Sequence, residues 1–397
     1  MANTLLTPTA VTREALRVLH QKCNFIKTIN RQYDDSFAKT GAKIGDSLKI
    51  RLPNQYTVRS GAVMDVQNTS ESSVTLQVAT QKGVDMNFTS SELTLSLDDF
   101  SKRILEPAMS VLAAAIESDV MNVYKDIYQQ SSNVGAAATS AKLLAGKKLL
   151  VDALAPSSPR WRANYGSQEN VDLVEALKTL FHASNEIKDQ YIDGAMGTAL
   201  GFDHYENTLW PRHTSGTENG ASTTITVNGS NQTGASVTVT NGSSKTLAVG
   251  DIITFSGCNR VHPETKLDTG VAQQFVVTTA LTSSGTSVAI SPSIITSGPT
   301  QNVSASPTTA QAITKVGGAS TAYNIGMLYH QDAFTFASAD LVMPDGVDWK
   351  ARENFDGISM RIVRQYTINN DQLPCRIDVL YGYKTIRAAL AARFANN

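Results

Sequence analysis

The stretch that decides the fold contains Gly250-Asp-Ile-Ile-Thr-Phe-Ser-Gly257 and, further along, Phe275-Val-Val277. Short apolar runs of this kind alternate with Asn-Gly and Ser-Gly turns throughout residues 214–322, where Ser, Thr, Gly, Val and Ala dominate. Only eight residues of this stretch are charged: Glu218, Lys245, Asp251, Arg260, Glu264, Lys266, Asp268 and Lys315. Short strands separated by such turns predict a small antiparallel barrel or sandwich.

The sequence before this stretch alternates between helical and strand patterns. Residues 136–151 and 170–183 have helical spacing, and the short run Trp161–Tyr165 between them predicts a strand. The glycine-rich run from Gly194 to Gly201 has the spacing of neither a phosphate-binding loop nor a dinucleotide fingerprint. We therefore interpret it as a turn between a helix and a strand.

Strand patterns resume after the β-rich stretch, from Tyr323 onward. Residues 358–366 and 377–383 flank the polar turn Asn369-Asn370-Asp371 and predict a hairpin. The β-rich stretch thus interrupts a domain of helices and strands, and we interpret it as an insertion whose two ends lie close together on that domain. The predicted fold class is α+β with an inserted all-β barrel domain.

The N-terminal part predicts a helix followed by a hairpin. Apolar residues recur at helical spacing from Val11 to Ile29, which indicates an amphipathic helix. Residues 48–59 and 74–89 alternate between apolar and polar side chains, with a polar break between them, and predict a long hairpin. Such a hairpin has too little one-sided apolar surface to be stable alone, so we expect another surface to cover its edges.

A long helix is predicted from Asp98 to about Tyr128, because its apolar residues approximate one stripe. Asp98 and Asp99 would lie in its first turn, where the helix dipole favours carboxylates. Pro107 is expected to kink or restart the helix, since proline lacks the backbone donor. A helix of roughly thirty residues runs about 45 Å and could cross a whole domain.

Charge is nearly balanced over the whole chain but not along it. Lys and Arg total 34 and Asp and Glu total 35, which gives no case for a nucleic-acid or membrane binder. Residues 1–59, however, hold ten Lys and Arg and four Asp and Glu. Two interpretations stay open: a solvated helical face, or a surface that faces packaged nucleic acid.

No group of residues predicts catalysis, a cofactor or a metal ion. The nucleophile elbow, the P-loop and the zinc-protease motif are missing, and the six histidines show no metal-ligand spacing. Asp203 and His204 are adjacent, but neighbouring side chains of a strand point to opposite faces and cannot act together. We expect the chain not to be an enzyme.

The sequence also bears on compartment. Cys23, Cys258 and Cys375 lie far apart without CxxC spacing, which argues against a disulfide framework and a structural zinc site. The start lacks a basic region followed by an apolar one, and no apolar run is long enough to span a bilayer. We expect synthesis in a reducing cytoplasm and no membrane partner.

Taken in order, several of these segments resemble the coat proteins of tailed bacteriophages with the Hong Kong-type capsid fold, in the podovirus-like branch that carries an insertion domain. The motifs that carry the resemblance are Ile192–Gly197 with Gly201–Tyr205, Gly250–Gly257 with Phe275–Val277, Tyr323–Phe334, and Gly357–Arg361 with Arg376–Gly382. The resemblance runs from about Leu48 to the C-terminus. Where the family's inserted domain often extends a charged loop, this chain has the short, uncharged Asn228–Gly234.

The resemblance implies five regions in chain order. They are an N-terminal arm at 1–45, an extended loop hairpin at 46–92, a spine helix with the first part of the peripheral and axial domains at 93–213, the inserted β-barrel domain at 214–322, and the closing axial and peripheral part at 323–397. The side chains of the arm and the loop that we expect at subunit interfaces are Arg13, Arg17, Arg51, Tyr56, Arg59 and Asp65.

The resemblance also implies function and partners. The chain would assemble with itself, through hexamers and pentamers, into an icosahedral head that encloses double-stranded DNA. A scaffolding protein, a portal protein and a decoration protein are the other expected partners, and the protein would be made in the bacterial host and kept in the virion. The near-neutral net charge suits close packing of many copies, because a strong charge of one sign would repel across every interface.

Three alternatives stay open at this point. A phage tail-tube or adhesin-like binding module is suggested by the Ser/Thr/Gly-rich β domain, but the long helix placed before that domain argues against it. An encapsulin-type compartment would share the fold and hold enzyme cargo, whereas the insertion favours a phage. An enzyme is the third alternative, and no convergent motif supports it.

Overall fold

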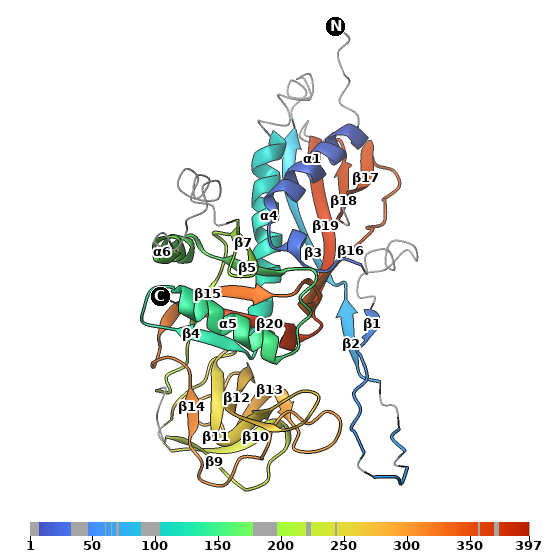
Figure 1. Ribbon diagram of the computed structural model, residues 1–397. Coiled ribbons are helices and arrows are strands. Elements are labelled where there is room, and N and C mark those ends of the chain that lie inside the picture. The colour runs from blue at the N-terminus through green and yellow to red at the C-terminus, as the bar shows by residue number, and fades with distance from the viewer. Residues whose placement is uncertain are drawn as a thin grey trace. The chain divides into compact units, whose positions relative to one another are not determined.

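The computed structural model describes residues 8–32, 47–59, 61–64, 66–68, 71–88, 104–177, 197–219, 224–242, 244–355, 358–368 and 373–396. The chain divides into two compact units. The first unit comprises Met1–Ile50, Ser73–Met121 and Phe334–Ile386, and the second comprises Arg51–Ser72, Asn122–Ala333 and Arg387–Asn397. Both contain helices and strands (Figure 1), so the chain has a mixed α/β structure, as the predicted class requires.

The first unit is built around one long strand, β19 (Leu373–Thr385). On one edge β19 pairs with β3 (Thr80–Phe88), and on the other it pairs with β18 (Ile358–Arg364) and then with β16 (Phe334–Ala339). Strand β17 (Trp349–Phe355) pairs with β18 and ends the sheet. The antiparallel pairing of β18 with β19 confirms the predicted C-terminal hairpin.

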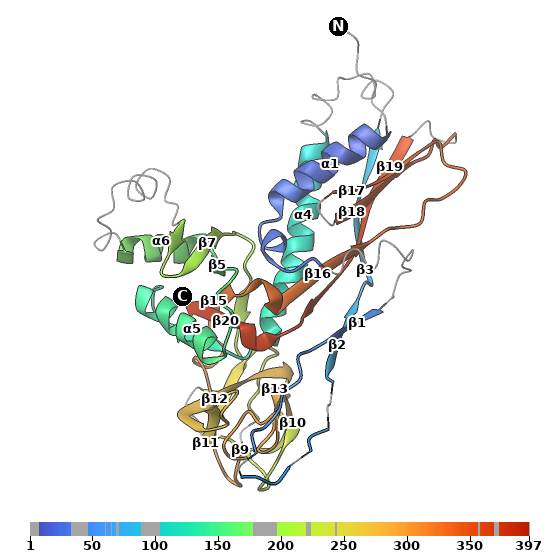
Figure 2. The ribbon, with the colours of Figure 1, turned by 45° about the vertical axis from the view of Figure 1, so that its right-hand side comes forward.

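Two helices cover one face of this sheet (Figure 2). Helix α1 (Pro8–Lys22) buries Val11, Ala15, Leu16 and Leu19 and leaves Arg13 and Arg17 exposed, as its amphipathic pattern predicts. Helix α4 (Glu106–Met121) places Pro107 in its first turn, where the missing N–H costs nothing. The short helix η1 (Ile26–Thr28) follows α1.

Two helix predictions need correction. The N-terminal helix ends at Lys22 and not near Ile29, because the Phe25 N–H turns away and donates to the buried carboxylate of Glu117 in α4, at 2.5 Å. The long helix is shorter than predicted: α4 ends at Met121 and continues as the 3-10 helix η4 (Asn122–Asp126), while Ile127 and Tyr128 are not helical. Residues 98–103 of that prediction lie outside the described residues.

The predicted hairpin is only partly correct. Strands β1 (Ser47–Arg51) and β2 (Ser73–Gln77) pair with each other, and Leu52 N–H donates to the Ser72 carbonyl at 2.9 Å. The segment after Val78, however, is strand β3 and belongs to the five-stranded sheet. Its alternating pattern was interpreted correctly as a strand, but its partner is β19, almost three hundred residues later in the chain.

The second unit contains a seven-stranded sheet in the order β4-β20-β15-β5-β7-β6, with β8 on β15. These strands span β4 Gln130–Asn133, β5 Trp161–Tyr165, β6 Thr198–Ala199, β7 Phe202–Glu206, β8 Arg212–Thr214, β15 Ala322–Tyr329 and β20 Ala391–Asn396. The pairs β4/β20 and β5/β7 are parallel, and the others are antiparallel. Strand β5 has the predicted bounds.

Helices α5 (Ser140–Asp152) and α6 (Ser167–Leu177) pack against this sheet. Leu143 and Leu150 of α5 and Leu173 of α6 share a core with Phe202, Leu328 and other sheet residues. Where the structure describes their ends, both helices begin and end within a few residues of the prediction. Residues 178–183 of the second predicted helix lie outside the described residues. Gly201, with φ +91°, forms the turn between β6 and β7, and residues 194–196 of the predicted turn lie outside the described residues.

The β-rich stretch forms a six-stranded antiparallel sheet in the order β14-β11-β12-β13-β10-β9. The strands are β9 Ile225–Val227, β10 Gly234–Asn241, β11 Ile252–Val261, β12 Asp268–Thr279, β13 Ser287–Ile294 and β14 Ile313–Lys315. Val227 exchanges backbone hydrogen bonds of 2.9 Å with Gln311 and Ala310, which joins the β9 edge of the sheet to the segment leading into β14. Phe255, Phe275, Val237 and Val277 are among the side chains of its core.

Candidate functional site

The predicted interface residues that the structure describes belong to both units. Arg13 lies 3.7 Å from Glu353 of β17, and Arg17 pairs with Glu14 of its own helix at 2.6 Å. Arg51 pairs with Glu71 at 3.0 Å, across the strands that open and close the loop between β1 and β2. The arginine of each pair is exposed and its partner is at least partly exposed, so each pair contributes little to stability. Asp65 lies outside the described residues.

Tyr56 and Arg59 belong to the loop that joins β1 to β2. Tyr56 is exposed, and the Arg59 guanidinium donates to the carbonyls of Gly61 and Val63. The two limbs of the loop are joined at Thr57 and Gln67: the Thr57 N–H donates to Oε1 of Gln67 at 2.9 Å, and Nε2 of Gln67 donates to the Thr57 carbonyl at 2.6 Å. The loop therefore has internal order without a core of its own.

Apolar side chains of the same loop face solvent. Val58 is 95% exposed, Val63 83%, Met64 78% and Val66 71%. Exposed apolar side chains that gather on one segment are typical of interaction surfaces. The residues of this loop that were predicted at interfaces are charged or aromatic, and the apolar ones were missed, although the run Ala62-Val-Met64 was a visible signal. We call residues 52–68 the apolar loop.

A second group is buried, where the six-stranded sheet meets the seven-stranded sheet of the same unit. Arg393 of β20 is fully buried and donates through Nη1 to the Gly250 carbonyl at 2.8 Å. Its Nε and Nη2 donate to Oε1 of Gln130 at 2.9 and 2.5 Å, and its guanidinium lies 5.7 Å from the centre of the Tyr124 ring. Burial lowers the pKa of Arg393, but an arginine keeps its charge in proteins.

Asp251, next to Gly250, is also fully buried and accepts three hydrogen bonds. His213 Nε2 lies 2.9 Å from its Oδ1, and its Oδ2 accepts the N–H groups of Gly216 and Ala248 at 3.0 and 2.8 Å. The edge of the His213 ring contacts Tyr323, at 5.3 Å between ring centres. Burial raises the pKa of Tyr323. The carboxylate thus joins β8 and the start of the β-rich stretch to the segment just before β11.

Two further contacts complete this seam. The backbone of Gln130 exchanges two hydrogen bonds with the side chain of Gln274, at 2.7 and 3.1 Å, and Arg260 pairs with Asp152 of α5 at 2.6 Å. Together with Arg393 and Asp251, these residues form what we call the polar seam. Sequence reasoning missed it, since its members come from separate parts of the chain and no motif joins them.

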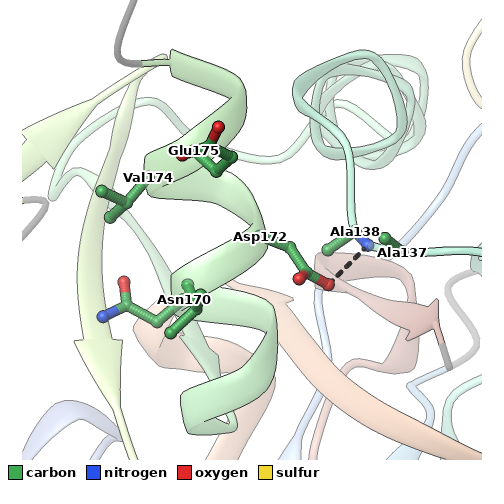
Figure 3. Close-up of a pocket in the computed structure, with 7 residues that line it drawn as sticks. Ala137, Ala138, Asn170, Asp172, Val174 and Glu175 are labelled. Carbon is green, nitrogen blue, oxygen red and sulfur yellow. Dashed lines mark hydrogen bonds between the residues drawn. The ribbon is translucent and has the colours of Figure 1, made fainter.

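A pocket of about 570 Å³ lies beside α6 and is lined by Val174 and Glu175 among others (Figure 3). Its Asp172 carboxylate accepts the Ala138 N–H at 3.1 Å and so holds the loop before α5. Across the described part of the chain, no group of three or more His, Cys, Asp or Glu side chains could hold a metal ion.

A smaller polar hollow of about 300 Å³ lies on the first unit's sheet. Its charged residues are satisfied locally: Arg376 pairs with Asp85 at 3.1 Å, and Arg361 pairs with Asp378 at 2.6 Å. Gly83 forms its floor, and a Cβ there would lie 2.5 Å from the Ile377 carbonyl oxygen. The hollow is therefore a consequence of close strand packing.

Asp203 and His204 bond to different groups, as their alternation along β7 predicts. Thr198 Oγ1 donates to Asp203 at 3.0 Å, whereas His204 is bonded to the Tyr165 hydroxyl at 2.8 Å and to the Ala199 carbonyl at 3.0 Å. Desolvation lowers the pKa of His204.

Among the helices that the structure describes, none is long and apolar enough to cross a bilayer.

Comparison with known proteins identifies the kind of protein to which this geometry belongs. Residues 212–392 match the family model described as P22 coat protein, gene protein 5. This match spans a little under half of the chain and supports a tailed-phage coat protein. The matched part begins at β8, covers the whole six-stranded sheet, and ends in β20 one residue before Arg393. A search of curated proteins found no match.

Solved structures similar to the coat protein are phage capsid proteins and related particles. The Mycobacterium phage Che8 structure is 10% identical with a TM-score of 0.47, over 94% of this chain and 90% of that one. The capsid protein of Ralstonia phage GP4 is 6% identical with a TM-score of 0.42, over 94% and 91%. The CUS-3 coat protein I-domain is 33% identical with a TM-score of 0.20, over 24% of this chain and 98% of that one.

The family match bears on the alternatives that the sequence left open. The coat protein is structural and is not an enzyme, which the sequence predicted. A tail-tube or adhesin-like module and an encapsulin-type compartment are not favoured. A capsid protein assembles with copies of itself into a shell and is a component of the virion.

Proposed function

We propose that the coat protein assembles through hexamers and pentamers into an icosahedral head around double-stranded DNA. A separate scaffolding protein, a portal protein and a decoration protein are its proposed partners, and the host bacterial cytoplasm is the proposed place of synthesis. We further propose that residues 214–322 are an inserted β-barrel domain, that residues 1–45 and 46–92 are the arm and the extended loop, and that α4 belongs to the spine helix of 93–213. The part at 323–397 would close the peripheral and axial domains.

The observation that supports this proposal is the solvent exposure of apolar side chains in the apolar loop. Four of its side chains are more than two thirds exposed, although each would stabilise an interface by about 1.5–3 kcal/mol if it were fully buried. A shell requires head-to-tail interfaces between identical subunits, in which one patch meets a different patch of the neighbour. A projecting loop with apolar side chains and little internal core is suited to such an interface.

We also propose that six further residues lie at subunit interfaces: Arg13, Arg17, Arg51, Tyr56, Arg59 and Asp65. Arg51 and Arg59 flank the apolar side chains of the loop and would form the polar rim of its interface. Rim charges chiefly affect the rate and the salt dependence of association, whereas the apolar centre affects its free energy.

The experiment is assembly of the full chain, expressed alone and together with its neighbouring phage genes, and followed by sedimentation and negative-stain electron microscopy. Two matched substitutions test the loop: Met64→Ser removes apolar surface, and Met64→Leu keeps it. We expect shells, or sheets and spirals of rings, from the unaltered chain and from Met64→Leu, and a shift toward free subunits for Met64→Ser. Nuclease-resistant DNA in particles made with the other phage genes would support packaging.

Two results would contradict the proposal. A monodisperse monomer or dimer under all conditions would exclude shell assembly, and the β-rich stretch should then be tested as a binding module. Shells from Met64→Ser in the same yield as from Met64→Leu would show that the apolar loop is not part of a subunit interface. Because Met64 is exposed, both variants should fold equally well, which circular dichroism of the free subunit checks.

A further inference from the structure

Asn-Gly sequences occur twice in the described part of the six-stranded sheet, at Asn228-Gly229 and at Asn241-Gly242. A third, Asn219-Gly220, has its glycine outside the described residues. Asn-Gly is the dipeptide in which a backbone amide can most easily attack the preceding side chain, because glycine has no Cβ to obstruct the approach. The two described sites differ sharply in how the structure holds the reacting groups.

At Asn241 the side chain and the next amide are both held. The Asn241 Nδ2 group donates to the carbonyls of Lys245 at 2.7 Å, Ser283 at 3.3 Å and Thr282 at 3.4 Å, while its Oδ1 accepts the Lys245 N–H at 3.0 Å. The Gly242 N–H donates to the Thr224 carbonyl at 3.1 Å. This amide therefore cannot turn toward the Gly242 nitrogen without breaking several hydrogen bonds.

At Asn228 the same groups are accessible. Asn228 is exposed at the end of β9, and Gly229 has φ +104°, a conformation that glycine adopts without strain. The backbone of Asn228 is anchored, since its N–H donates to the Thr238 carbonyl at 2.9 Å and its carbonyl accepts from Gln232 at 2.8 Å. Among the described residues, neither the Asn228 side-chain amide nor the Gly229 N–H has a hydrogen-bond partner.

We propose that Asn228 is a site of spontaneous deamidation in the folded protein, and that Asn241 is protected. The Gly229 nitrogen attacks Cγ of Asn228, the bond from Cγ to the amide nitrogen breaks, and that nitrogen leaves as ammonia with the proton of the Gly229 N–H. The product is a five-membered succinimide. Water then opens it at either carbonyl and gives aspartate or isoaspartate, so no oxidant, reductant or enzyme is required.

The modification changes the surface of the β-rich stretch. No Asp, Glu, Lys or Arg occurs between Glu218 and Lys245, so a carboxylate at 228 is the first charge on this part of the sequence. Isoaspartate also adds one backbone carbon between the anchors at Thr238 and Gln232. In a shell of many copies, the surface around the Asn228–Gly234 loop would become progressively more negative with the age of the particle.

The test is peptide mass spectrometry of the full-length protein after storage at mildly alkaline pH, with isoaspartate counted by protein isoaspartyl methyltransferase. We expect the Asn228 peptide to deamidate at least about tenfold faster than the Asn241 peptide, because an opening cost of only about 1.4 kcal/mol at Asn241 slows its reaction tenfold. Storage of the same protein unfolded in urea is the matched control, in which the two rates should become similar. Asn228→Gln should abolish the fast reaction.

Equal rates at the two sites in the folded protein would overturn the proposal, since the hydrogen bonds of Asn241 would then give no protection. An intact Asn228 in the folded protein, together with a reactive Asn228 in urea, would overturn it as well, because the folded loop would then prevent the attack. Both outcomes can be read on isolated subunits and do not depend on shell assembly.

Discussion

Replacing Arg393 by methionine tests the polar seam. Methionine has a similar length and no donors, so Arg393→Met removes the hydrogen bonds to Gly250 and Gln130 and leaves the strand β20 otherwise unchanged. The Gly250 carbonyl and Oε1 of Gln130 would both lose a buried partner. We expect the seam to open far more often while the two sheets that it joins stay folded.

The magnitude follows from these two acceptors. A buried group that is left without its partner costs about 1–3 kcal/mol, which gives about 2–6 kcal/mol for the pair. The substitution also removes a stabilising cost, because methionine, unlike the guanidinium, carries no charge that must lose its water on burial. This gain offsets part of the loss. The net expectation is about 2–4 kcal/mol, or an opening that is roughly 30-fold to 700-fold more frequent.

The assay is hydrogen exchange read by mass spectrometry. A single melting temperature is not well defined for a chain of two units, whereas exchange reports local opening. The reporters are the N–H groups of Gly250 and Val277, which donate to Val277 and Asp251 carbonyls at 2.8 and 2.9 Å. Peptides of β10 and β13 are the internal reference, because they lie on the side of the sheet away from Gly250 in strand order.

A matched control is Arg260→Met at the same seam. Arg260 and Asp152 are partly exposed, and such a pair contributes about 1 kcal/mol or less, so the exchange near Gly250 should change little. If Arg393→Met left the exchange of Gly250 and Val277 unaltered, the cost of burying the guanidinium would equal its gain, and the seam would not hold the two sheets together. Equal effects of both variants would refute the distinction between buried and exposed pairs made here.

Two further predictions concern single buried groups. Glu117→Leu should destabilise the first unit by about 1–3 kcal/mol in urea unfolding, because the Phe25 N–H loses its acceptor, whereas Glu117→Gln keeps an acceptor and should cost less; equal losses would contradict this. His204 has a folded pKa below its ordinary 6.5, so the unfolded chain binds more protons, and the contribution of His204 is full above that value and is lost as the pH falls toward the folded pKa. The free energy of unfolding of the second unit in urea should therefore be lower at about pH 5.5 than at about pH 7.5, and His204→Gln should reduce that difference.

Local patterns in the sequence predicted local structure well. Trp161–Tyr165 is a strand with the predicted bounds, because alternation and flanking turns decide a strand from its own residues. The composition change near Thr214 likewise marks the start of the segment that forms the six-stranded sheet. Turn residues and apolar periodicity determine structure over a few residues, so they can be interpreted without knowledge of the rest of the chain.

Predictions failed where a distant partner decides the outcome. The pattern of residues 80–88 indicated a strand but could not show that its partner is β19. The helical spacing continued past Lys22, yet the Glu117 carboxylate, 92 residues from Phe25, takes the N–H that would have continued the helix. The interface prediction named charged and aromatic residues and missed Val58 and Met64, since the exposure of these two side chains is known only from the fold.

The polar seam shows why such partners matter for the whole unit. Arg393 lies 143 residues from Gly250 and 263 from Gln130, so the guanidinium is satisfied only when three separate segments are in place. A partly formed seam would leave a buried charge without acceptors, which is strongly unfavourable, whereas an apolar seam would tolerate small displacements. The C-terminal strand β20 and the six-stranded sheet should therefore pack against each other in a single arrangement, and each should need the other in place. Hydrogen exchange of the Arg393→Met variant measures this coupling directly, because the Gly250 N–H would stay protected if apolar contacts alone held the seam.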